Sequence, residues 1–140
     1  MLFLVAAAMS VSGRQANSPT KLAQKIIAYE KHHAFGIRDA EFLSFFTPSM
    51  RRAIKRDTSG RQIGVLNYDP LCQCQDNDGL RMVLIGVRVR GSAAKLRLQT
   101  GGAHDRTNMR LLALRIGREW KISDVSTAMT PSLAAALADY

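Results

Sequence analysis

The chain has 140 residues, of which 46% are hydrophobic and 22% are charged. This length and composition predict one globular domain that buries its own core, and they exclude a largely disordered chain. The formal net charge is +9 at pH 7, and residues 1–13 carry no charged side chain. The excess positive charge therefore belongs to residues 14–140 and favours an anionic partner.

The first segment, MLFLVAAAMSVSG, is an apolar run from Leu2 to Val11 with small residues after it. It is too short to span a bilayer, which needs about 20 residues, and it is typical of a secretory signal peptide over residues 1–13. The usual preceding positive charge is missing, which leaves open a truncated start or a buried first helix. No cysteine directly follows the apolar run. We expect a periplasmic or secreted domain with no lipid anchor and no stable membrane insertion.

Three helical segments are predicted next. A polar residue at position 17 or 18 can cap a helix that begins at Pro19. A second segment begins near Asp39, and Thr47 ends it and caps a third segment that runs from Pro48 to about Arg56. The apolar residues at helical spacing predict the buried faces: Leu22, Ile26, Tyr29, Phe42, Leu43, Phe45, Phe46, Met50 and Ile54.

After residue 81 the sequence changes to the two-residue period of β-strands. Residues 82–90 alternate, and Gly91 with Ser92 forms a two-residue hairpin turn before a second alternating run. The expected register places Arg88 opposite Lys95. Val83 is also expected to face inward, and the inward pairs are Val89 with Ala94, Val87 with Leu96, and Ile85 with Leu98.

A second hairpin is predicted from residues 109–116 and 120–125 around the loop Gly117-Arg118-Glu119. The strand pairs expected in this hairpin are Ile116 with Trp120, Leu114 with Ile122, and Arg115 with Lys121. A last short helix is expected to begin at Thr130. The predicted class is α+β, with N-terminal helices packed on a curved antiparallel four- to five-stranded meander sheet and a short C-terminal helix.

Three stretches of the chain, FFTPSM, YDPLCQCQD and GREWKISDV, resemble a bacterial family called domain of unknown function 3828. The resemblance covers about residues 22 to 137. It implies a single cone-shaped domain over residues 14–140, of the nuclear-transport-factor-like or cystatin-like α+β group, in a secreted or envelope protein. Related cone-shaped folds host enzymes, ligand carriers and protein-binding modules, so the resemblance leaves the function open.

Both cysteines lie in the stretch YDPLCQCQDNDG, where one residue separates Cys72 from Cys74. Their α-carbons would be about 6.5 Å apart in an extended chain, so a disulfide closes only if the chain bends at Gln73. Free buried thiols, a metal site and a redox site are the alternatives. A zinc site would need two more ligands, and the spacing of the histidines gives no reason to expect them there. The prediction is a disulfide that pins a turn, with no metal and no cofactor.

Other polar residues offer weaker candidate sites. Residues 76–79 (Asp-Asn-Asp-Gly) imitate the start of a calcium loop, but the third carboxylate and the closing glutamate are missing, so we expect a turn. His104 and Asp105 lie in a glycine-rich loop with no nucleophile indicated. A pocket between the sheet and the helices would be lined by Tyr29, His33, Tyr68 and Asp124.

The strongest signal is positive charge in the strands. Residues 81–121 contain ten Lys or Arg and two acidic residues. Like charges on opposing strands cost stability, so their presence suggests an anionic partner, although a merely solvated face is the alternative. No aromatic residues interleave with them, which argues against nucleic acid. The predicted partner-binding residues on the face away from the helices are Arg88, Arg90, Lys95, Arg97, Arg115 and Lys121.

Two functions follow as hypotheses. The first is a non-catalytic domain that recognises an acidic protein, as an accessory subunit or an immunity-type inhibitor. The second is a small enzyme or ligand carrier that uses the pocket. A core packed shut by Phe42, Phe45, Phe46 and Trp120 would favour the first, and an open cavity lined by His33 and Asp124 would favour the second. We find no catalytic motif in the sequence, which also favours the first hypothesis.

Overall fold

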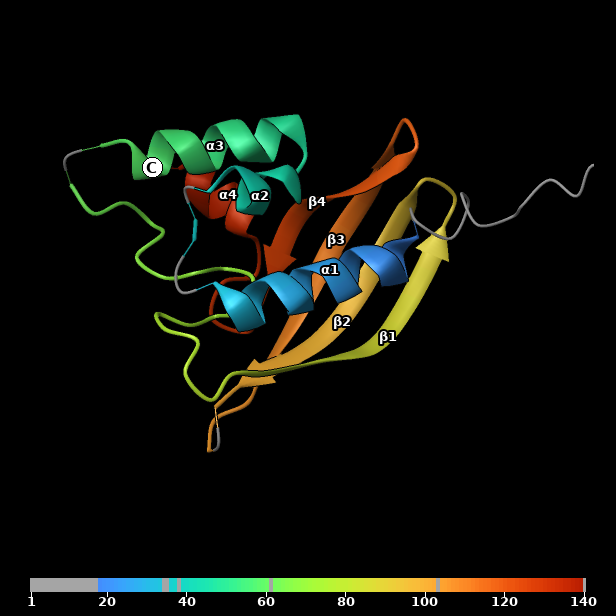
Figure 1. Ribbon diagram of the computed structural model, residues 1–140. Helices are drawn as coiled ribbons and strands as arrows, with labels where there is room; N and C mark the ends of the chain where they lie inside the picture. Colours follow the sequence, from blue (N-terminus) through green and yellow to red (C-terminus); the bar gives the residue numbers. More distant parts are fainter. Residues whose placement is uncertain (1–17, 34–35, 38, 61, 103, 140) are drawn as a thin grey trace, which may run out of the picture.

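The computed structural model describes residues 18–33, 36–37, 39–60, 62–102 and 104–139. The predicted export segment, residues 1–13, lies outside them. Helices come first, a four-stranded antiparallel meander follows, and a short helix closes the chain, which confirms the predicted α+β class (Figure 1). The elements are α1 (Pro19–His32), α2 (Ala40–Ser44), α3 (Pro48–Thr58), β1 (Arg81–Arg90), β2 (Ala93–Gly101), β3 (Thr107–Ile116), β4 (Glu119–Ser126) and α4 (Leu133–Ala138).

The helices begin where polar side chains can bind their free N–H groups. Ser18 Oγ accepts a hydrogen bond from Lys21 N at 3.1 Å, and Thr47 Oγ1 accepts one from Met50 N at 3.3 Å, as the predicted caps of α1 and α3 require. The last helix begins later than predicted. Ser132 caps it by accepting from Ala135 N at 3.1 Å, whereas Thr130 precedes it in a turn.

The first hairpin has its predicted turn, where Gly91 adopts a φ of +58°. Val89 pairs with Ala94, Val87 with Leu96 and Arg88 with Lys95, as predicted.

The predicted register of this hairpin fails closer to the start of β1. The ladder shifts between Leu84 and Gly86, so the extra residue is Ile85, and Leu84 rather than Ile85 pairs with Leu98. Val83 and Ile85 consequently leave the core and are exposed, which corrects the predicted inward face.

The second hairpin turns over two residues, Gly117 and Arg118, rather than the predicted three. Gly117 has a φ of +62°, which suits a tight turn, and Ile116 pairs with Glu119. Every pair near the turn is therefore displaced by one residue from the prediction. Arg115 pairs with Trp120 instead of Lys121, and Leu114 pairs with Lys121 instead of Ile122. This slip exchanges the two faces of β3.

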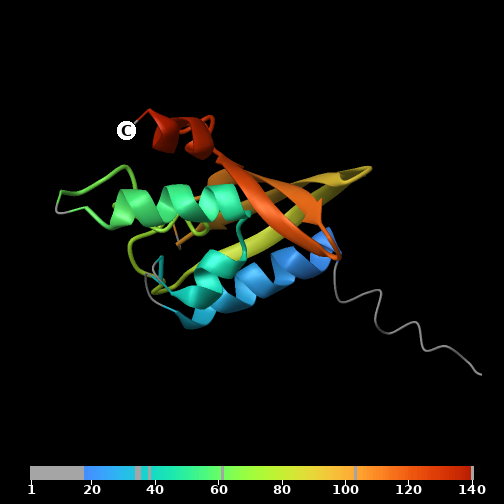
Figure 2. The ribbon, with the colours of Figure 1, turned by 90° about the horizontal axis from the view of Figure 1, so that it is seen from above.

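The helices bury most of the inner face of the sheet, but Val87 and Val89 near the first turn stay exposed, although they were predicted to face the core. α1 crosses that face, and α3 and α4 pack against β4 (Figures 1 and 2). The aromatic side chains expected to close the cone are all buried: Phe42, Phe45, Phe46 and Trp120. None of the described helices is long and apolar enough to cross a membrane.

The two edges of the sheet differ. The segment at Phe46 forms a parallel bridge to Ile122 on β4, with Ile122 N donating to Phe45 O at 2.7 Å and Thr47 N donating to Ile122 O at 2.9 Å. β1 is the other edge, and no strand among the described residues pairs with its outer side. The described part of the chain therefore leaves two surfaces of the sheet uncovered, the β1 edge and the outer face.

Candidate functional site

The outer face of the sheet carries a cluster of exposed cations, called here the outer basic face: Arg88, Arg90, Lys95, Arg97 and Arg110. Arg88 lies opposite Lys95, and Arg97 lies opposite Arg110 on the next strand. No member has a carboxylate partner within the described residues. Two like-charge pairs therefore stand side by side on adjoining strands, which is an unfavourable arrangement in the isolated protein.

Two of the predicted partner-binding residues lie elsewhere. Arg115 pairs with Trp120, whose side chain is buried on the inner face, so Arg115 belongs to the helix side of the hairpin. Lys121 turns to the edge of the sheet, where its Nζ donates to Ser44 O at 2.6 Å and lies 3.2 Å from a carboxylate oxygen of Glu119. The predicted pair of Arg115 and Lys121 does not exist, because the turn is one residue shorter than expected. Arg97 and Arg110 form the second like-charge pair instead.

An apolar stripe runs beside the outer basic face. The three alternate residues Leu112, Leu114 and Ile116 of β3 expose 37–44% of their surface. The sequence predicted Leu114 and Ile116 to face the core, because Leu111, Leu112, Ala113 and Leu114 are all apolar and either alternate set could be buried. The structure buries Leu111 and Ala113 instead. The outer face thus offers aliphatic surface and positive charge together.

A groove of about 870 Å³, called here the arginine groove, opens on the outer face beside the start of β3 and the segment that follows β4. Its lining includes the side chains of Arg97, Arg106 and Arg110, with Ile85 and the fully projecting Met129, which is 92% exposed, beside them. A Cβ at position 86, where the chain has glycine, would lie 2.8 Å from Arg97 Nη2. The Arg97 guanidinium therefore lies over the glycine backbone, at the point where Ile85 bulges out of the ladder.

The four predicted pocket residues do not converge. Tyr29 and His33 line a second groove, of about 610 Å³, between α1 and the tip of the second hairpin, but Tyr68 and Asp124 do not line it. Tyr29 donates its hydroxyl proton to Asp39 Oδ2 at 2.9 Å, and its ring stacks on His33 with the centroids 4.1 Å apart. Burial and the hydrogen bond to Asp39 raise the pKa of the Tyr29 hydroxyl, so that hydroxyl stays protonated.

Asp124 has a structural role at the start of α4. Its Oδ1 accepts from Ala134 N at 2.9 Å and from Val125 N at 2.8 Å, and its Oδ2 accepts from Ser132 Oγ at 2.7 Å. These bonds tie β4 to the helix that follows it. The acceptor positions of this carboxylate are thus already used by the protein, which leaves little for a substrate.

A buried acid pair, Glu30 and Asp69, is the site that sequence reasoning missed. Each residue exposes only 1% of its surface, and their carboxyl groups hydrogen-bond to each other. Burial and the neighbouring charge of Asp69 raise the pKa of Glu30 to about 10, and burial also raises the pKa of Asp69. At neutral pH the pair therefore keeps a proton. Glu30 Oε1 and Asp69 Oδ2 have no hydrogen-bond partner.

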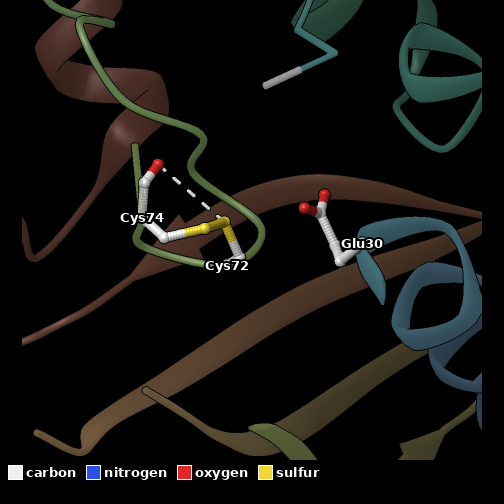
Figure 3. A group of neighbouring side chains, drawn as sticks. All are labelled: Glu30, Cys72 and Cys74. Carbon is white, nitrogen blue, oxygen red and sulfur yellow. Dashed lines mark hydrogen bonds between the residues drawn. A yellow bond between two sulfur atoms is a disulfide. The ribbon is translucent and has the colours of Figure 1, made fainter. Parts of the chain in front are cut away.

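The cysteine turn adjoins this pair. Cys72 and Cys74 are joined by a disulfide, with their α-carbons 5.2 Å apart. Gln73 adopts a φ of +55°, which is the bend that closing the ring requires. Asp69 N donates to Cys74 O at 2.8 Å, and Thr100 Oγ1 donates to Cys72 O at 2.8 Å. Figure 3 shows the Glu30 carboxyl group facing the disulfide across a short gap.

The stretch that imitates a calcium loop is a turn, as predicted. Asp78 N donates to Asp76 Oδ1 at 2.9 Å, and Asn77 Nδ2 donates to Glu30 O at 3.1 Å. His104 and Asp105, the other candidate, are exposed in the connection between β2 and β3. The turn of residues 76–79 fastens the end of α1 to the cysteine segment through the bond from Asn77 to Glu30. Only the fold could reveal this, because 47 residues separate Glu30 from Asn77.

No protein-family model matches the chain, and no curated protein matches it. The resemblance to domain of unknown function 3828 thus stays a prediction. Among solved structures, the chain is similar to a chain in the crystal structure of the type VI native effector-immunity complex Tae3-Tai3 from Ralstonia pickettii. The TM-score is 0.60 at 14% sequence identity, and the match covers 80% of this chain and 96% of that one. At this identity the likeness establishes a shared fold.

Proposed function

We propose that this chain is a non-catalytic binding protein of the immunity type, which recognises an acidic protein through the outer face of its sheet. The observation that carries the proposal is the outer basic face, where Arg88, Lys95, Arg97 and Arg110 form two like-charge pairs and make no salt bridge with a carboxylate of the described residues. The shared fold with a chain of an effector-immunity complex supports the choice of the immunity type.

Electrostatics favour a partner over a solvated face. Like charges directly opposite on neighbouring strands are destabilising, and the two pairs adjoin on β2, where Lys95 and Arg97 are two residues apart. A face that only keeps a protein soluble can intersperse both signs and avoid this cost. Acidic side chains of a partner would relieve both repulsions at once, so the cations would be neutralised in the complex but not in the free protein.

The apolar stripe adds a second requirement for the partner. Leu112, Leu114 and Ile116 lie on the strand that also carries Arg110, so a partner covering the cations also covers aliphatic surface. Protein interfaces combine an apolar centre with charged residues around it. The phosphate backbone of a nucleic acid has no apolar groups and would leave the stripe in water. We therefore propose a protein partner that presents carboxylates beside aliphatic or aromatic side chains.

The expected export of the chain places this encounter outside the cytoplasm. An immunity-type protein must reach the compartment where its target acts, and the apolar segment at residues 1–13 provides the export expectation. Fractionation of a tagged protein tests this part separately. Cleaved protein in the periplasm or the medium would support it, and uncleaved protein in the cytosol would contradict it.

The binding proposal is tested by capture from envelope extracts, followed by mass spectrometry and measurement of affinity for the captured protein. The decisive variant is Arg97→Glu with Arg110→Glu. It keeps a like-charge pair at these positions, so stability should change little while the sign of the face is reversed. The control is Arg52→Glu with Lys55→Glu, which makes the same change in net charge at exposed positions of α3.

We expect the sheet variant to lose capture and the α3 control to retain it. Binding of the unmodified protein should weaken as salt rises, because exposed charges are screened within about 8 Å at physiological ionic strength. The captured protein should also be toxic when it is produced alone and harmless when it is produced together with this chain. Equal capture by both variants would refute the proposed face, and a harmless partner would refute the immunity role.

A further inference from the structure

We propose that reduction of the Cys72–Cys74 disulfide converts the cluster beneath α1 into a binding site for one Zn²⁺ ion, held by the two cysteine sulfurs and the Glu30 carboxylate. The sequence alone gave no reason for such a site, because it offered only two ligands and no histidine at a suitable spacing. The third ligand is an acid from a helix that lies 42 residues earlier in the chain. This inference is independent of the proposed function.

The ligand atoms already lie close together. An oxygen of Glu30 and the sulfurs of Cys72 and Cys74 are all within 4.8 Å of one another. Zinc binds sulfur at about 2.3 Å and carboxylate oxygen at about 2.0–2.2 Å, so two ligands of one ion are at most about 4.6 Å apart. Small side-chain rotations would therefore suffice to bring all three atoms into one coordination sphere.

The disulfide explains the cysteines but does not explain Glu30. This carboxyl group is buried with 1% exposure, and its Oε1 has no protein partner. A carboxyl group in such a position is costly to bury unless it is paired with a cation or a hydrogen-bond donor. It nevertheless points toward the sulfurs, as Figure 3 shows. A cation between the carboxylate and two thiolates would satisfy this oxygen.

The donor set selects the metal. Two thiolates with one carboxylate suit Zn²⁺, whereas Ca²⁺ and Mg²⁺ require shells of oxygen ligands. The bend at Gln73, with a φ of +55°, places the two cysteines on one side of the turn. The hydrogen bond from Asp69 N to Cys74 O involves backbone atoms and not the sulfurs.

Asp69 is the positioning residue of this site. It hydrogen-bonds to the Glu30 carboxyl group, and its own Oδ1 is fixed by Leu71 N at 2.8 Å. Asn77 Nδ2 fixes the backbone of the same residue by donating to its carbonyl oxygen, Glu30 O, at 3.1 Å. Ligands of protein metal sites are typically oriented by such outer hydrogen bonds, and losing one commonly costs 10–100-fold in metal affinity.

The conversion balances as follows in the presence of a water-soluble phosphine. The phosphorus is oxidised to the phosphine oxide with an oxygen from water, the sulfur–sulfur bond breaks, and the two protons of that water appear on the thiols. Zn²⁺ then displaces these two protons to solvent as the zinc–sulfur bonds form. The proton that Glu30 holds in the oxidised protein passes to Asp69, which then donates it to the Glu30 carboxylate.

The experiment titrates Zn²⁺ into phosphine-reduced protein and into oxidised protein by calorimetry. Co²⁺ serves as a second probe because its thiolate complexes absorb through sulfur-to-metal charge transfer, and Trp120 fluorescence reports whether the reduced chain stays folded. The test variants are Glu30→Gln and Asp69→Ala, the second of which removes the side chain that orients Glu30. The matched control is Asp78→Asn, which removes an exposed acid from the neighbouring turn of residues 76–79.

We expect one Zn²⁺ per reduced chain, no binding at this site in the oxidised chain, and thiolate absorption with Co²⁺. Asp69→Ala should weaken binding by about 10–100-fold and Glu30→Gln by at least as much, while Asp78→Asn leaves the affinity unchanged. Equal affinity in Glu30→Gln and the unmodified protein would overturn the proposal. So would equal binding by the oxidised chain, or a reduced chain that takes up no Zn²⁺ or stays unfolded when Zn²⁺ is added.

Discussion

Replacement of Glu30 by glutamine should change how the stability of the oxidised protein depends on pH. In the folded protein, burial and the nearby Asp69 raise the pKa of Glu30 from its ordinary value near 4.5 to about 10. The unfolded chain releases this proton near pH 4.5, whereas the folded chain holds it to a much higher pH. The favourable contribution is therefore complete below about pH 4.5 and is lost progressively as the pH rises toward 10.

The size of the effect follows from proton linkage. A single proton bound by the folded state and absent from the unfolded state changes the free energy of unfolding by about 1.4 kcal/mol per pH unit. Between pH 6 and pH 8 the unmodified protein should therefore lose up to about 2.7 kcal/mol through Glu30. The glutamine side chain of Glu30→Gln donates an N–H to Asp69 without needing a proton, so its stability should fall less steeply.

Urea unfolding followed by Trp120 fluorescence at pH 6, 7 and 8 measures this, with a chelator present and no reductant. The slope difference between the unmodified protein and Glu30→Gln isolates Glu30, because the two proteins differ at no other position. Glu41→Gln is the control, since it removes an exposed acid on α2. A Glu30→Gln variant with the same pH slope as the unmodified protein would refute the claim that folded Glu30 holds a proton.

Three further changes test other parts of the structure by the same unfolding assay. Arg97→Glu alone should raise stability by roughly 0.2–1 kcal/mol, because the repulsion with Arg110 becomes an attraction, and a loss of stability would contradict the observed register. Asp124→Ala should cost about 1–3 kcal/mol, because it leaves the donors at the start of α4 unpaired, and an unchanged free energy would show that this cap contributes nothing. A double Cys72→Ser, Cys74→Ser variant should fold and lose only about 1.6 kcal/mol, because the ring closes such a short loop, and failure to fold would contradict this chain-entropy argument.

Local features of the sequence were enough to predict the elements and their order. The caps at Ser18 and Thr47 and the glycine turn at Gly91 depend on residues within three positions of each other. Such contacts form in any folded context, because the chain brings neighbouring residues together without help. The required bend at Gln73 was likewise predictable from the spacing of the two cysteines.

The faces of the strands were decided by the tertiary structure. In the run from Met109 to Ile116 each alternate set has three apolar residues and one arginine, so the sequence pattern did not distinguish the buried set from the exposed one. The two-residue turn at Gly117 buries Leu111 and Ala113 and exposes the apolar stripe. The extra residue at Ile85 does the same for the start of β1. A shift of one position exchanges the faces, because side chains alternate along a strand.

The buried cluster also depended on the tertiary structure alone. Glu30 follows an ordinary helical pattern, and nothing near it in the sequence marks it as buried beside Asp69 and the disulfide. The two carboxyl groups meet because α1 packs across the sheet and the turn at Asn77 fastens its end to the cysteine segment. Contacts between residues about 40 positions apart are set by how the elements pack against one another, and periodicity within one element carries no information about them.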